Sequence, residues 1–123
     1  MILGMGLDIV DVKRMEKHCD DENFMRRFLH EREYEEIKKS KESPAMLLAS
    51  RFAVKEAFGK ATGIGLRGIA LSDIQLDHDT LGRPILRLHG SAEQKATELG
   101  VNHIHVSISH EAQIAAAVVI FES

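Results

Sequence analysis

The chain has 123 residues, of which 44% are hydrophobic and 28% charged, and this composition supports one folded domain with its own core. Only 5% are aromatic, with no Trp, and the formal net charge is −3, which argues against general nucleic-acid binders and membrane-surface binders. The single cysteine excludes an intrachain disulfide, and the sequence has neither a membrane-spanning run nor a signal peptide, so we expect a soluble cytoplasmic protein.

The first predicted element is a buried strand over residues 2–10. Its side chains alternate between an apolar face and a face of small or polar residues: Leu3, Met5, Leu7 and Ile9 against Gly4, Gly6, Asp8 and Val10. Aspartate is disfavoured in strands, and Asp8 stands on the face where two glycines leave room for another group to approach. This carboxylate is therefore a candidate functional group.

Helical patterns fill most of the next fifty residues. Asp11 can cap a short helix to about residue 18, four-residue spacing of apolar side chains predicts a helix over 22–29, and residues 30–41 resemble a polar surface helix. Ser43 followed by Pro44 is typical of a helix start, and Gly63 fits the left-handed position after a helix end. We predict a long helix over residues 44–62.

The remaining elements alternate strand and helix signals. We expect strand-like segments at 73–77 and 85–89, a helix at 91–99, and strands at 103–110 and 114–121. Ser91 and Gln94 fit a capping box, and Gly100 fits the end of that helix. Because short turns join the later strands, we predict a single α+β domain over residues 1–123, with a largely antiparallel sheet packed by helices.

The long helix carries an unusual group of charges opposite its apolar arc. Glu56 and Lys60 form a favourable pair four residues apart, whereas Arg51 and Lys55 repel each other at the same spacing. Three cations beside one carboxylate fit either a polyanionic ligand or a solvated helix face. If Asp8 lies near Glu56, the two carboxylates fit a Mg²⁺ site; alternatively, Asp8 pairs structurally with one of the cations.

Two further motifs are ambiguous. The segment GIGLRG matches a dinucleotide-binding pattern, but it closes a helix instead of opening one, so we expect a helix end and a loop, with backbone contact to a ligand possible at Gly63 and Gly65. Near the C-terminus, His105, Ser107 and Ser109 share one strand face, and His110 follows at the strand end. No hydrolase motif surrounds the serines, so these groups either hydrogen-bond locally or hold a phosphate.

The order and spacing of five motifs resemble the holo-acyl-carrier-protein synthases, the short 4′-phosphopantetheinyl transferases, over essentially the whole chain. The motifs are G-x-D at 6–8, R-F-A-x-K-E-A-x-x-K-A at 51–61, G-x-G at 63–65, G-R-P at 82–84 and V-S-I-S-H at 106–110. The resemblance implies transfer of the 4′-phosphopantetheine arm of coenzyme A to a serine of apo acyl carrier protein in fatty acid biosynthesis. It also implies a Mg²⁺ requirement and a homotrimer with active sites at subunit interfaces.

The resemblance also assigns roles to residues. Asp8 and Glu56 would bind Mg²⁺, and these two residues with Lys60 would be catalytic. Lys60 would stabilise the leaving phosphate, and Glu56 could accept the proton of the serine. Lys13 and Arg14, on the basic first helix, would dock the acidic carrier protein. Contacts to coenzyme A would come from Arg51, Lys55, Lys60, Gly63, Gly65, Pro84, Ser109 and His110, with Arg51, Lys55 and His110 at the 3′-phosphate end and ribose.

Two rival functions remain open at this point. The same cations and glycine loop could serve a non-catalytic nucleotide-binding or coenzyme A-binding module, which would bind ligand without forming product. Alternatively, the charges could form ion pairs that hold a trimer together in a structural protein, which would show no dependence on Mg²⁺.

Overall fold

A three-stranded antiparallel sheet joins the two ends of the chain. In the computed structural model, which describes residues 1–123, strand β1 (Ile2–Asp11) pairs with β5 (Ile114–Glu122), and β5 pairs with β4 (His103–Glu111). Strands β2 (Ile74–His78) and β3 (Pro84–Leu88) form a separate antiparallel hairpin beside β4. The predicted antiparallel α+β fold is confirmed.

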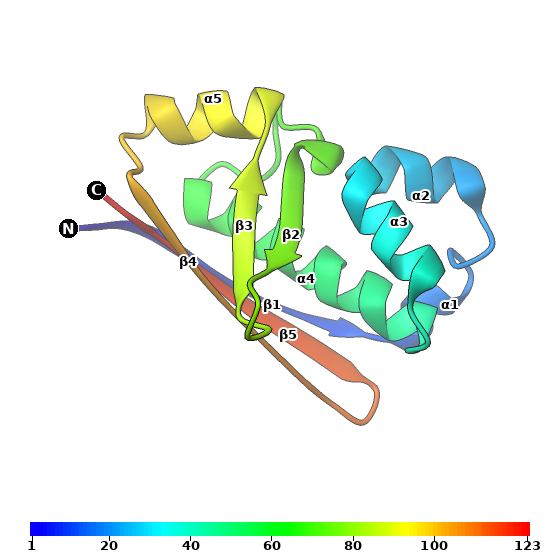
Figure 1. Ribbon diagram of the computed structural model, residues 1–123. Helices are drawn as coiled ribbons and strands as arrows, with labels where there is room; N and C mark the ends of the chain where they lie inside the picture. The colour runs from blue at the N-terminus through cyan, green and yellow to red at the C-terminus, as the bar shows by residue number, and fades with distance from the viewer.

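Helix α4 (Pro44–Thr62) packs along one face of the sheet and organises the core (Figure 1). Ser43 accepts a hydrogen bond from Met46 N, and Gly63 ends the helix with a φ of 84°, so both predicted ends are confirmed. The contact with β1 is close, because a Cβ on Gly6 would collide with the carbonyl oxygen of Ala57. The glycines of β1 therefore let the strand backbone lie directly on the helix.

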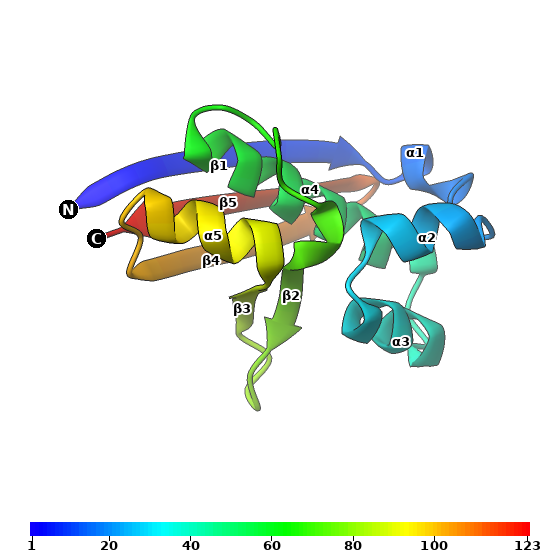
Figure 2. The ribbon, with the colours of Figure 1, turned by 90° about the horizontal axis from the view of Figure 1, so that it is seen from above.

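The remaining helices lie on the same side of the sheet. Figure 2 shows a cluster at one end of α4 and a single helix at the other end. The cluster contains α1 (Lys13–Glu16), α2 (Glu22–Phe28) and α3 (Glu31–Lys39), and the helix at the other end is α5 (Gly90–Glu98), which follows the short 3-10 turn η1 (Leu71–Asp73). None of the helices combines the length and apolar character that a membrane crossing requires.

The opposite face of the sheet has no cover in the single chain (Figure 1). The prediction of a buried first strand is therefore wrong for its apolar face: Met5, Leu7 and Ile9 are 62%, 64% and 66% exposed. Their cross-strand partners Ile120, Val118 and Ala116 lie on the same face and are only half-buried. Alternation correctly divided the strand into two faces, but it did not reveal that only one of them is covered within the chain.

The predicted capping box of the last helix is also wrong. Helix α5 begins one residue earlier, at Gly90, so Ser91 lies inside its first turn. Both the backbone N–H and the hydroxyl of Ser91 donate to Asp73 Oδ2, at 2.8 and 2.6 Å. These hydrogen bonds lower the pKa of Asp73. A carboxylate from η1 thus replaces the local cap at this helix start.

Candidate functional site

Two carboxylates from different elements meet on one side of α4. Asp8 lies on the face of β1 that packs against the helix, and Glu56 is half-buried on the helix itself. Burial raises the pKa of Glu56, the charge of Asp8 raises it further, and Lys60 and Arg14 oppose the shift. The four groups therefore form one electrostatic cluster, the carboxylate site: Asp8, Arg14, Glu56 and Lys60.

Lys60 connects the helix to the strand within the carboxylate site. Its Nζ donates to Asp8 Oδ1 at 3.2 Å and to the main-chain oxygen of Leu7 at 2.9 Å. The lysine side chain is 56% exposed whereas that of Asp8 is 16% exposed, so the cation can move while the carboxylate is held. An exposed ion pair of this kind contributes at most about 1 kcal/mol to stability.

The carboxylates of Asp8 and Glu56 suit Mg²⁺ better than a metal ion that needs all of its ligands from the protein. No cluster of three or more His, Cys, Asp or Glu side chains is present. The charge of Asp8 makes Glu56 harder to ionise, so a cation between the two carboxylates would be favourable. Mg²⁺ commonly binds one or two carboxylates together with water and substrate phosphate oxygens. Asp8 and Glu56 fit that pattern.

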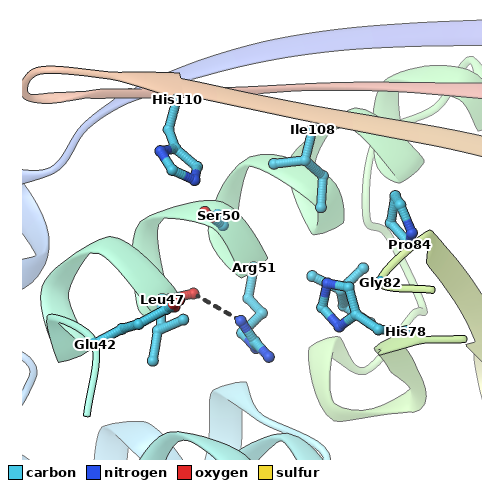
Figure 3. Close-up of a pocket in the computed structure, with 10 residues that line it drawn as sticks. Glu42, Leu47, Ser50, Arg51, His78, Gly82, Pro84, Ile108 and His110 are labelled. Carbon is cyan, nitrogen blue, oxygen red and sulfur yellow. Dashed lines mark hydrogen bonds between the residues drawn. The ribbon is translucent and has the colours of Figure 1, made fainter. Parts of the chain in front are cut away.

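A second feature, the Arg51 pocket, has a volume of about 290 Å³ and lies between α4, β4 and the β2–β3 hairpin (Figure 3). It brings together three of the predicted coenzyme A residues, Arg51, Pro84 and His110. Sequence reasoning missed two charged or titratable neighbours, Glu42 and His78, because only the hairpin's position beside α4 gathers them. The remaining lining residues are Leu47, Ser50, Leu76, Gly82 and Ile108.

Lys55 lines neither site, so its predicted contact with coenzyme A finds no support in the single chain. Its side chain is 1% exposed, and Nζ donates to Glu33 Oε1, Phe28 O and Leu71 O at 2.7, 2.7 and 2.9 Å. An ammonium group has three protons, so no donor is left for a phosphate. Burial lowers the pKa of Lys55, and Glu33 counteracts this.

Glu33 also resolves the repulsion expected between Arg51 and Lys55. This carboxylate is fully buried, with Lys55 at 2.7 Å and the Arg51 Nε at 3.9 Å. The helix that contains Glu33 looked like a polar surface helix in the sequence, so no local signal indicated the buried acid. The cation excess of α4 is therefore partly a structural ion network.

The other predicted residues lie around these two sites. Gly63 and Gly65 have φ values of 84° and 75° in an exposed loop just beyond Lys60, and the Thr62 hydroxyl accepts a hydrogen bond from Ile64 N in that loop. The loop closes a helix, as predicted. Ser109 shares the uncovered sheet face with its partner Ala116, so it points away from the Arg51 pocket, which lies on the His110 side of the strand.

An apolar hollow lies beside the basic helix α1. Its volume is about 290 Å³, and it is lined by Phe24, Arg27, Phe28, Phe52 and Leu71. Arg14 lies next to it, with its guanidinium carbon 5.9 Å from the centre of the Phe52 ring. Lys13 and Arg14 are exposed, so cations and an apolar surface adjoin each other there.

On one chain, the Arg51 pocket and the carboxylate site remain separate. The pocket is lined by none of Asp8, Glu56 or Lys60. The two sites lie on different sides of α4, and an anionic ligand that uses both must therefore cross the helix or contact a second chain.

The comparisons cover nearly the whole chain. Residues 4–119 match the family model described as the 4′-phosphopantetheinyl transferase superfamily. The chain is 50% identical over 122 residues to a holo-[acyl-carrier-protein] synthase of Treponema denticola, covering 99% of both proteins. Its fold is similar to that of the holo-[acyl-carrier-protein] synthase of Neisseria meningitidis, with a TM-score of 0.92 and 35% identity over 100% of both chains. A synthase of Bacillus anthracis in complex with CoA (3′,5′-ADP) superposes with a TM-score of 0.84 and 38% identity, over 100% of this chain and 98% of the other.

Proposed function

Because the chain belongs to the 4′-phosphopantetheinyl transferase superfamily, we propose that it transfers the 4′-phosphopantetheine arm of coenzyme A to a serine of apo acyl carrier protein. The products are holo acyl carrier protein, used in fatty acid biosynthesis, and adenosine 3′,5′-bisphosphate. The observation that carries this proposal is the meeting of Asp8, Glu56 and Lys60 on one side of α4.

The reaction forms a bond between the serine oxygen and phosphorus and breaks the bond from phosphorus to the leaving bisphosphate. Mg²⁺ held by Asp8 and Glu56 would neutralise charge on the pyrophosphate of coenzyme A. Lys60 is exposed enough to turn from Asp8 and donate to the leaving phosphate. Glu56 would accept the serine proton, directly or through a water.

The Arg51 pocket is our proposed site for the nucleotide end of coenzyme A. A guanidinium and an imidazole, from Arg51 and His110, face the same cavity as Pro84 (Figure 3). Arginine binds phosphate through paired, charge-assisted hydrogen bonds. Ser109 reaches such a ligand only at a contact between copies, because it lies on the other face of the sheet.

We propose that the active protein is a homotrimer in which the pocket and the carboxylate site of neighbouring subunits complete one another. Their separation on a single chain supports this, as does the uncovered sheet face with Met5, Leu7 and Ile9 exposed on it. Adjacent exposed apolar side chains commonly mark an interface. Sedimentation velocity tests the assembly: a monomer at active concentrations would contradict it.

The carrier protein would dock beside the carboxylate site. Lys13 and Arg14 would attract its acidic surface, and the hollow around Phe24 and Phe52 would receive its apolar side chains. We place the reaction in the cytoplasm, which the single free Cys19 suits, and treat residues 1–123 as one domain with one hydrophobic core.

The deciding experiment combines the protein with coenzyme A, Mg²⁺ and apo acyl carrier protein, followed by intact-mass spectrometry of the carrier. Transferase activity predicts a carrier that gains the phosphopantetheine arm. A non-catalytic coenzyme A-binding module would bind the ligand and leave the carrier mass unchanged, and a purely structural protein would respond to neither ligand nor metal.

A further inference from the structure

Arg51 is incompletely bonded in its pocket. The side chain is 4% exposed, yet only two of its nitrogens have an acceptor: Nη2 donates to Glu36 Oε2 at 3.1 Å and Nη1 to Leu47 O at 3.4 Å. Its Nε is buried without a hydrogen-bond partner. A guanidinium has five N–H donors, so this buried cation keeps unused donors beside an open cavity.

The two carboxylates nearest to Arg51 differ in how firmly they are held. Glu33 is fully buried and accepts hydrogen bonds from three other groups, His30 N, Lys55 Nζ and Leu76 N, at 2.9, 2.7 and 3.1 Å. Glu36 is 45% exposed, and Arg51 is its one ion-pair partner. Glu33 is therefore fixed in place, whereas Glu36 can swing into solvent at little cost.

The charge around the pocket makes the second carboxylate significant. Arg51 is the one arginine or lysine among the ten lining residues, and Glu42 adds a carboxylate to the same wall. With Glu36 bonded to Arg51, the guanidinium charge is already neutralised. Glu36 does not line the pocket but bonds the guanidinium from the α3 side, so a phosphate that binds Arg51 would compete with this carboxylate for the same cation, and the two anions would repel each other.

We propose that Glu36 occupies Arg51 as a substitute for phosphate and is displaced when coenzyme A binds, so that Glu36 sets the affinity of the pocket for the nucleotide end. This inference rests on the proposed function. Phosphate offers several oxygens to one guanidinium, whereas Glu36 forms a single hydrogen bond with it.

Calorimetric titration with adenosine 3′,5′-bisphosphate tests the exchange in the full-length protein. We expect Glu36→Gln to tighten binding about three- to tenfold, because the ligand no longer displaces a charged competitor. Glu35→Gln is the matched control. It removes the same charge from the neighbouring position of α3, where Glu35 is exposed and forms no ion pair with Arg51, and it should change affinity less than about twofold.

The possible outcomes separate the inference from the function. Unchanged binding in Glu36→Gln overturns the competition, and weaker binding overturns it in favour of Glu36 holding Arg51 in place for the ligand. An equal increase in bisphosphate affinity in both variants also overturns it, because the increase would then come from the change in net charge and not from the loss of the Glu36–Arg51 pair. Absence of bisphosphate binding in all three proteins, including the wild type, overturns the assignment of this pocket to coenzyme A together with the exchange.

Discussion

Two lysines of helix α4, Lys55 and Lys60, look alike in the sequence but lie in opposite environments in the structure. On one side, Lys55 is buried and gives every proton to acceptors inside the protein. On the other side, Lys60 is mostly exposed and pairs with Asp8, and the neighbouring Glu56 has a pKa that is raised first by burial and then by the charge of Asp8. The difference teaches that a cation's role depends on its partner, and this partner can be distant in the sequence. A buried partner makes the cation part of the core, whereas an exposed partner leaves it free to bind a ligand.

The sharpest test of this division is Lys55→Met. The variant leaves the Glu33 carboxylate buried without its closest cation, and losing one member of a buried ion pair costs roughly 3–5 kcal/mol. Urea unfolding at pH 7 measures the loss. Lys60→Met is the control on the exposed side, and we expect it to cost less than about 1 kcal/mol. A similar loss of unfolding free energy in the two variants would show that the two lysines do not differ in their contribution to the fold.

Glu56→Gln should lower the transfer activity without lowering the stability of the fold. If Glu56 binds Mg²⁺ as proposed, its loss removes several kcal/mol of charge stabilisation from the transition state, so we expect turnover to fall at least about 100-fold. The folded-state pKa of Glu56 is raised, so its contribution to stability is full below the unfolded pKa and is lost as the pH rises through the folded pKa. Glutamine does not charge, and the variant in EDTA at pH 7 should be at least as stable as wild type in urea unfolding. A clear loss of stability would show that Glu56 serves the fold.

Gly6→Ala tests how the strand places Asp8. The new Cβ would collide with the carbonyl oxygen of Ala57, so β1 must move away from α4, and such overpacking costs about 1–3 kcal/mol. Because Asp8 lies on the same face two residues later, transfer activity should fall along with stability. Full activity in this variant would mean that the close contact between strand and helix is not needed to bring Asp8 to Glu56.

Arg14→Glu gives the smallest of the expected effects. Reversing an exposed charge at a docking surface mainly slows association, so we expect the KM for acyl carrier protein to rise about tenfold while the KM for coenzyme A changes little. Lys41→Glu reverses an exposed charge that does not line the apolar hollow, and it serves as the control. An unchanged KM for the carrier in Arg14→Glu would locate docking elsewhere.

The sequence predicted most helices and strands because their signals are local. Ser43, Pro44 and Gly63 mark both ends of α4, and alternation identified the strands. The glycines of β1 also indicated a strand face open to close approach, and helix α4 lies directly on that face. These features depend on residues within a few positions of one another or on a missing side chain.

The errors involve partners that only the tertiary structure brings together. Glu33 reaches Lys55 from 22 residues earlier in the chain, out of a segment that looks like a solvated helix. Asp73 replaces the predicted cap of α5 from 18 residues earlier. The apolar face of β1 shows a third kind of error, because hydrophobicity predicts that a face will be covered without saying whether the cover lies in the same chain.

The central claim is that the Glu56 side of α4 performs phosphopantetheine transfer while the Lys55 side supports the fold. The most direct measurement is the initial rate at which apo acyl carrier protein gains the arm, followed by intact mass, with wild type and Glu56→Gln at equal concentrations in saturating coenzyme A and Mg²⁺. We predict rapid gain with wild type and a rate at least about 100-fold lower with the variant. No gain with wild type, or equal rates for the two proteins, would contradict the claim.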